Sequence, residues 1–294
     1  MKNEEKIFTV VLQKMESYIE IAIFQEDKLL QFDREETTNI ISYRKHNVFV
    51  GKFVNYAPSL NAIFVNVGYY KNGMIPFDHQ ENSLLKKQID FIKKFLGIEY
   101  NKSGESVIPV APSQPVIVKV VREPVEDKGP TLSFSLTVPG RYTVFLPFGE
   151  GIVFSRGAFS KEEKQHFTRL FEEKTKNKGG VIVRRLAKGV PQQYILAEID
   201  TLLNEWENIK RRLKEYFSRA PVQISENVSY EEIIVRDYLP NGTIRLYTNS
   251  EELLQTLSSI LPRYHINAIE KVVIREGNIY RKIGLAGEIE RIFH

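Results

Sequence analysis

The residues best suited to chemistry in this 294-residue chain are aromatic and basic side chains gathered in residues 47–77. Lys52 and Lys71 supply positive charge there, and six rings accompany them: Phe49, Phe53, Tyr56, Phe64, Tyr69 and Tyr70. Rings that reach solvent can stack on the bases of a single-stranded nucleic acid, and nearby ammonium groups can neutralise its phosphates. The chemistry expected of this stretch is therefore non-covalent binding of a nucleic acid.

A second set of candidate residues is basic and lies in residues 156–188. This segment holds ten Lys or Arg residues against four Glu, whereas the whole chain has a formal net charge of only +4. A further basic cluster covers residues 210–214. Phosphate binding needs several cations on one surface. Because runs of Lys and Arg more often cover a solvated helix face, both interpretations stay open.

Residues for covalent or metal chemistry form no recognisable motif. The chain has no cysteine, its five histidines are scattered without His-x-x-x-His spacing, and neither a Gly-x-Ser-x-Gly motif nor a phosphate-binding loop occurs. Some carboxylates could meet across one sheet and hold magnesium for phosphodiester cleavage, namely Asp33, Glu35, Glu231, Glu232 and Asp237. Charged strand ends are the commoner explanation of such residues. The prediction is therefore that this chain has no catalytic residue and no metal ligand.

The stretch that carries the rings is predicted to form a small β-barrel. Apolar and polar residues alternate over residues 63–67, as in a strand with one face in a core. Gly68 and the Asn72-Gly73 dipeptide supply turns. Strands that follow one another without a helix, together with rings and lysines, favour an OB-type barrel that leaves one face open to nucleic acid.

Both ends of the chain are predicted to contribute to one further sheet. Strands are expected at residues 6–12, 18–24 and 28–32, and again at residues 232–238 and 243–247 with a hairpin turn at Asn241-Gly242 between the last two. Helices are expected at residues 84–95, 160–173, 198–217 and 251–261. Ser160 and Glu163 have the spacing of a capping box, and Trp206 is predicted to be a core residue. The turn-rich residues 97–115 are predicted to be a solvent-exposed insertion.

Several motifs in one order resemble the ribonuclease E/G family. They are the strands of residues 47–77, which resemble an S1-type domain, Lys128-Gly129, residues 139–147, residues 151–156, residues 180–184, residues 203–210 and residues 235–239. The resemblance implies an α+β fold in which an S1-type OB-fold barrel (44–132) and a 5′-sensor region (133–219) are inserted into an RNase H-like α/β subdomain (1–43 and 220–294).

The resemblance also implies individual binding residues. For RNA binding these are Lys52, Phe64, Met74 and Lys128, with Phe64 at a base-stacking position and Met74 where the family has a second stacking phenylalanine. For a 5′-phosphate they are Val144, Arg156, Arg184 and Arg185. Arg185 replaces a threonine of the family pattern, so it either adds affinity or indicates a different grip on phosphate.

The expected partner is single-stranded RNA, with preference for a 5′-monophosphate end. In the family, the catalytic Asp pair that holds magnesium follows the segment matched by the last residues of this chain, so the catalytic domain is expected to be absent and no cofactor is expected here; Mg²⁺ would belong to a longer parent endoribonuclease. No run of about 18 apolar residues occurs, so no membrane partner is expected and a cytoplasmic location is the default.

The resemblance leaves open whether the chain forms a homo-oligomer. Two alternative functions stay open as well. One is a short, complete magnesium-dependent endoribonuclease that uses the carboxylates named above. The other is a ribosome-associated RNA-binding protein without 5′-end sensing.

Overall fold

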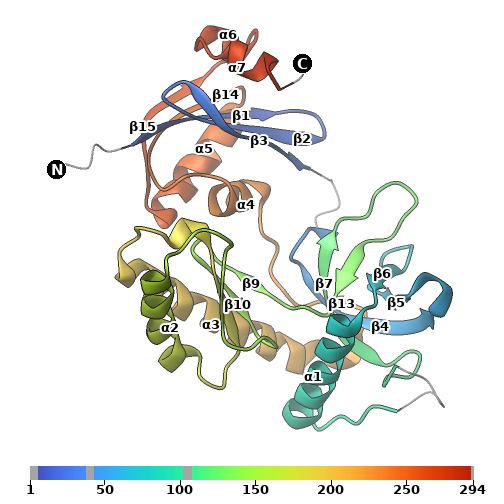
Figure 1. Ribbon diagram of the computed structural model, residues 1–294. Coiled ribbons are helices and arrows are strands. Elements are labelled where there is room, and N and C mark those ends of the chain that lie inside the picture. The colour runs from blue at the N-terminus through green and yellow to red at the C-terminus, as the bar shows by residue number, and fades with distance from the viewer. Residues whose placement is uncertain (1–5, 38–42, 102–107, 293–294) are drawn as a thin grey trace. The chain divides into compact units, whose positions relative to one another are not determined.

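The computed structural model describes residues 6–37, 43–101 and 108–292. The chain forms two compact units: one joins residues 1–39 to residues 228–294, and the other comprises residues 40–227. Both units combine helices and strands (Figure 1).

The unit built from both ends contains a five-stranded mixed sheet in the order β15-β14-β1-β2-β3. The first three strands, β1 (Ile7–Lys14), β2 (Tyr18–Gln25) and β3 (Lys28–Glu36), pair antiparallel, which confirms the strands predicted near the amino terminus. Strand β14 (Gly242–Thr248) pairs parallel with β1, and β15 (Ile266–Val273) pairs parallel with β14.

Helices cover both faces of this sheet (Figure 1). On one side lie α4 (Tyr230–Asp237), α5 (Glu251–Ile260) and the 3-10 helix η5 (Leu261–Tyr264), and on the other lie α6 (Ile279–Lys282) and α7 (Ala286–Glu290). In β1, Val10 and Leu12 pack against the first layer and Val11 against the second, as the two-residue period of a strand requires.

The strand predicted at residues 232–238 is wrong, because this segment is helix α4. Its run of β-branched residues, Ile233 to Val235, is fully buried and resembles a buried strand in sequence. Ser229 decides otherwise: its side chain accepts a hydrogen bond from the amide of Glu232 and caps the helix. Asn241-Gly242 therefore connects a helix to a parallel strand and is not a hairpin turn.

The second unit contains a closed barrel of five strands, compatible with an OB fold. Its strands pair in the order β4-β5-β6-β8-β7, and β7 closes the ring by pairing with β4. They are β4 (Val48–Ala57), β5 (Ala62–Asn66), β6 (Gly73–Pro76), β7 (Pro115–Arg122) and β8 (Thr131–Ser133). The short strand β13 (Val222–Gln223) pairs antiparallel with Phe49 and Val50 of β4. The 3-10 helix η2 (Pro58–Leu60) joins β4 to β5.

Helix α1 (His79–Leu96) follows the barrel strand β6 and confirms the helix predicted there. Asp78 caps it by accepting from the amide of Glu81 at 2.8 Å. The insertion predicted after this helix is partly wrong, because Ile108 and Val110 are 0% exposed and belong to the barrel core. Residues 102–107 of that insertion lie outside the described residues.

A four-stranded sheet and two helices complete the second unit. The sheet order is β11-β12-β10-β9, formed by β11 (Ile152–Phe154), β12 (Gly180–Val183), β10 (Thr143–Leu146) and β9 (Val138–Pro139). Helices α2 (Lys161–Thr175) and α3 (Gln192–Tyr216) share a hydrophobic core with the buried side chains of this sheet. The short 3-10 helices η3 (Arg185–Ala187) and η4 (Phe217–Arg219) lie before and after α3 in the chain.

Two predictions for these helices are confirmed. Ser160 and Glu163 form the reciprocal capping box that starts α2, with distances of 3.2 and 2.7 Å. Trp206 of α3 is 6% exposed and contacts the rings of Phe91 and Phe148, so it is a core residue. Helix α3 begins six residues before the predicted start, directly after Pro191.

Candidate nucleic-acid interface

The outer face of strands β4, β5 and β6 brings together three of the four residues predicted to bind RNA. Residues paired directly across a sheet point to the same face. Lys52 pairs with Asn66, and Phe64 pairs with Asn55 on one side and Met74 on the other. The alternate residues Ile63 and Val65 are 0% exposed and fill the barrel.

The three side chains differ in how far they reach solvent. Lys52 is exposed, Phe64 is half-buried and Met74 is 37% exposed. A ring and a thioether side by side form an apolar strip on which a base can rest, and Lys52 adds a positive charge to the same face. The outer face can therefore bind a single strand by stacking and by phosphate contact.

Lys128 lies in a turn that packs beside this face. The amide of Met74 donates to the carbonyl of Pro130 at 3.0 Å. Gly129 is pressed against the backbone of Asn72, where a side chain has no room. Both contacts hold the turn against β6, and Lys128 within it is exposed to solvent.

Two of the rings that suggested nucleic-acid binding are not available for it. Phe49 and Phe53 are 2% and 4% exposed and belong to the barrel core. Tyr56 and Tyr69 are half-buried, whereas Tyr70 is 64% exposed. Alternation along β4 places every second side chain inside the barrel, which explains why ring count alone overestimates the binding surface.

The residues predicted to bind a 5′-phosphate gather at the four-stranded sheet. Val144 lies on β10 opposite Ile182 of β12, and Arg184 directly follows β12. The amide of Ser155 donates to the carbonyl of Val183 at 3.0 Å, which places the exposed Arg156 at the same end of the sheet as Arg184. Arg185 begins η3 and is exposed.

Arg184 is held by the turn between β9 and β10. Its amide donates to the carbonyl of Tyr142 at 2.8 Å, and its Nη1 donates to the carbonyl of Gly140 at 2.7 Å. The second bond fixes the plane of the guanidinium group. A guanidinium of fixed orientation can offer a planar pair of N–H groups to phosphate oxygens.

Glu198 of α3 organises this turn and was missed by the sequence analysis. Its carboxylate accepts the amide N–H groups of Arg141 (2.6 Å), Tyr142 (2.9 Å) and Thr143 (2.8 Å), and the Thr143 hydroxyl (2.9 Å). A signal was present, because Glu198 interrupts the apolar stripe that Ile195, Ile199 and Leu202 form on α3. A carboxylate on the buried face of a helix needs partners.

Charge is concentrated beneath the same turn. Arg141 is 0% exposed, and burial lowers the pKa of its guanidinium, with the neighbouring Arg184 acting in the same direction. Burial raises the pKa of the Glu198 carboxyl, against the opposing effect of its hydrogen bonds to Thr143 and Arg141. Two guanidinium groups beside one carboxyl group give this end of the sheet an excess of positive charge, which suits an anion.

Comparison with known proteins identifies the chain's family. The model of the ribonuclease E/G family matches residues 137–294. This chain belongs to the ribonuclease E/G family. It is 27% identical to ribonuclease E of Nostoc sp. strain PCC 7120 over 83% of this chain and 33% of that protein.

Other relatives of this ribonuclease E/G family chain have a similar extent of match. Ribonuclease E of Synechocystis sp. strain PCC 6803 is 26% identical over 78% of this chain and 31% of that protein. Ribonuclease G of Escherichia coli strain K12 is 25% identical over 84% of this chain and 48% of that protein. The chain thus spans about a third to a half of the length of these relatives.

The carboxylates considered for magnesium binding have other partners in this family member. Glu35 accepts from the Tyr238 hydroxyl at 2.6 Å, and Asp237 pairs with Arg236 at 2.7 Å. Glu232 accepts from Tyr264 at 2.7 Å. Among residues 6–37, 43–101 and 108–292, no group of three or more His, Cys, Asp or Glu residues is arranged to hold a metal ion. Glu35, Asp237 and Glu232 are therefore engaged within the protein.

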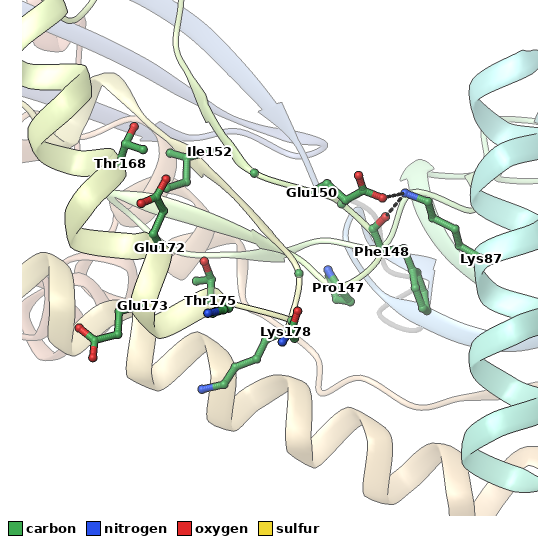
Figure 2. Close-up of a pocket in the computed structure, with 15 residues that line it drawn as sticks. Lys87, Pro147, Phe148, Glu150, Ile152, Thr168, Glu172, Glu173, Thr175 and Lys178 are labelled. Atoms are coloured by element: carbon green, nitrogen blue, oxygen red, sulfur yellow. Dashed lines mark hydrogen bonds and ion pairs between the residues drawn. The ribbon is translucent and has the colours of Figure 1, made fainter.

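A cleft of about 860 Å³ opens near α1 in the same unit as the barrel. Figure 2 shows Lys87 reaching toward Glu150, which it meets at 2.7 Å, and toward the carbonyl of Phe148. The charged residues of the cleft balance, since three lysines face three glutamates: Lys87, Lys176, Lys178, Glu150, Glu172 and Glu173. Without a positive excess, and without any of the predicted binding residues in its lining, the cleft is a poorer candidate for RNA than the barrel face.

In the described part of the chain, no helix combines the length and apolar character needed to span a bilayer.

Proposed function

We propose that this chain binds single-stranded RNA on the outer face of the barrel and recognises a 5′-monophosphate end at Arg184. The observation that carries the proposal is the shared outer face of Lys52, Phe64 and Met74 on a closed five-stranded barrel, with the turn of Lys128 packed beside β6. Membership of the ribonuclease E/G family supports a ribonuclease-related role.

The proposal assigns three structural parts to the chain. The barrel is an S1-type OB fold, the β9–β12 sheet with α2 and α3 is a 5′-sensor region, and the mixed sheet of the other unit is RNase H-like. Support for the last assignment comes from its strand order, in which three antiparallel strands continue into two parallel ones, with helices on both faces.

In the proposed parent protein, this chain is the recognition portion of a magnesium-dependent endoribonuclease of RNA processing and decay in the cytoplasm. Relatives named ribonuclease E and ribonuclease G support that context. The residues of this chain would hold the strand by stacking and phosphate contact and orient its 5′ end.

The first test compares two RNAs that differ only at the 5′ end, one with a monophosphate and one with a hydroxyl. Charge-assisted hydrogen bonds contribute about 1.5–3 kcal/mol each, so Arg184→Ala should reduce the preference for the monophosphate by about tenfold or more. Phe64→Ala should weaken both RNAs alike by about fivefold or more, since a stacked base contributes about 1–3 kcal/mol.

Arg169→Ala is the matched control, because Arg169 is an exposed arginine of α2. It should leave the end preference intact. If Arg184→Ala keeps the full preference, the chain binds RNA without sensing its end, as a ribosome-associated binder would. Magnesium-dependent cutting that survives purification would favour the complete short nuclease, and Glu35→Gln and Asp237→Asn would then be the variants to examine.

A further inference from the structure

Tyr70 is the most exposed ring of the barrel in the part of the chain that the structure describes. It lies in the connection between β5 and β6, and 64% of it is accessible to solvent. Exposed apolar side chains are common singly, but a large ring gains from being covered. The surroundings of Tyr70 indicate what could cover it.

The Tyr70 ring is held in one orientation. Its hydroxyl donates to the carbonyl of Glu126 at 2.9 Å, and its ring lies 4.4 Å from the ring of Tyr69. The contacts continue inward, since Tyr69 lies 5.0 Å from Tyr43 and Tyr43 stacks on the buried Phe49 at 5.3 Å. A ring that is bound through its hydroxyl and contacts a neighbouring ring loses little conformational freedom when a ligand stacks on it.

The position of Tyr70 makes it continuous with the proposed RNA face. The turn of residues 126–130 contacts both the β5–β6 connection and strand β6. The carbonyl of Glu126 accepts from the Tyr70 hydroxyl, and the carbonyl of Pro130 accepts from the amide of Met74. Lys71 lies with its Nζ 5.9 Å from the centre of the Tyr70 ring. A strand that follows Phe64 and Met74 therefore meets the 126–130 turn and the Tyr70 ring at its border.

The charges around Tyr70 favour a base over a phosphate as its ligand. Lys71 lies near the ring, while the turn that Tyr70 contacts carries Glu126 and Asp127 as well as Lys128, so negative charge offsets the positive charge there. Stacking needs no charge excess and is available to every base. Phosphate contacts would come from Lys52 and Lys128 on the adjoining face.

We propose that Tyr70 is a further base-stacking site, which extends the RNA path beyond Phe64 and Met74. The inference rests on the proposed function, because it needs RNA on the barrel face. Tyr70 is one of the six rings named from the sequence, and the structure gives it a specific place on the RNA path. The ligand is an unpaired nucleobase of single-stranded RNA.

The experiment measures the affinity of the purified chain for a fluorescently labelled oligouridine, in parallel for wild type and four variants. Tyr70→Ala should weaken binding by about fivefold or more. Tyr70→Phe retains the ring and removes the bond to Glu126, so most of the affinity should remain. Phe64→Ala measures how much of the affinity depends on the outer face of β4, β5 and β6. Leu60→Ala is the matched control, because Leu60 is also 64% exposed but lies on η2.

Each outcome decides between the two proposals. A loss in Tyr70→Ala, retained affinity in Tyr70→Phe and no change in Leu60→Ala support stacking. Equal losses in both Tyr70 variants would show that the hydroxyl bond orders the turn and would overturn the stacking site. Wild-type affinity in Tyr70→Ala beside weak binding in Phe64→Ala would overturn the inference alone. Wild-type protein that does not bind the oligouridine would overturn the proposed function and the inference with it.

Discussion

Glu198 and Thr143 are joined through one carboxylate oxygen, which accepts both the amide N–H of Thr143 at 2.8 Å and its hydroxyl at 2.9 Å. The amides of Arg141 and Tyr142 donate to the same carboxylate. Helix α3 thereby fixes the turn whose Gly140 carbonyl accepts from Arg184. The orientation of Arg184 thus depends on Glu198, which does not contact the proposed phosphate itself.

Glu198→Ala should destabilise the chain substantially. Removing the carboxylate leaves three buried amides without this acceptor, and each unsatisfied buried group costs about 1–3 kcal/mol, so a loss of about 3 kcal/mol or more in the free energy of unfolding is expected. Urea unfolding measures it. Glu207→Ala on the exposed side of α3 is the control and should change stability by less than about 0.5 kcal/mol. Equal effects of the two variants would contradict the role given to Glu198.

Gly140→Ala should disturb the same turn from the other side. A Cβ at this position would lie 2.6 Å from Cδ of Glu198 and 2.9 Å from the carbonyl oxygen of Thr143, so the backbone or the carboxylate must move. We expect a loss of about 1–3 kcal/mol, as for other overpacked sites. Gly287→Ala in α7 meets nothing within 4 Å and should be neutral or slightly stabilising, because alanine favours a helix. Thermal unfolding of both variants tests the contrast.

Met74→Phe should strengthen RNA binding. The side chain is 37% exposed and lies beside Phe64 in the sheet register, so a phenylalanine there would place a second ring on the outer face. One added base stack predicts an affinity about fivefold higher or more, measured by fluorescence anisotropy with an unstructured RNA. Leu60→Phe adds a ring on η2 and should change nothing. A gain in the control equal to that in Met74→Phe would point to non-specific stacking.

Local signals predicted the parts of the fold that local physics determines. The capping box at Ser160, the alternation through Ile63 and Val65, and the core role of Trp206 each depend on neighbours in sequence, and the structure confirms them. Helix α4 was mistaken for a strand because buried helices and buried strands share a continuous apolar run. The cap at Ser229 was the local feature that distinguished them.

The candidate site divides in the same way. Lys52, Phe64 and Met74, which the family resemblance implied, share a face because strand alternation and pairing place them there. Glu198 meets Thr143 across 55 residues of chain, and only the packing of α3 on the sheet creates that contact. Ile108 and Val110 likewise become core residues through tertiary packing, so their turn-rich neighbourhood predicted exposure wrongly.

Lys119 is a buried ammonium group in the barrel wall. It is 9% exposed, and its Nζ donates to the hydroxyl of Thr137 at 2.9 Å. Burial lowers the pKa of Lys119 from 10.5 to about 8, while Glu81 raises it and Lys45 lowers it further. Glu81 is itself engaged by the amide of Phe134 at 2.8 Å. The charged form of Lys119 is therefore less favourable in the folded chain than in the unfolded one.

This shift predicts a dependence of stability on pH with a defined sign. Below the folded pKa of about 8, both states carry the proton and the full cost of burial is present. Between about 8 and 10.5, the unfolded state binds more protons than the folded state, so stability should rise with pH, by about 2 kcal/mol from about pH 7 to about pH 9.5. Lys119→Met, which cannot titrate, should lack this rise. Urea unfolding of both proteins at each pH measures the difference, and parallel curves would show that Lys119 is not the group responsible.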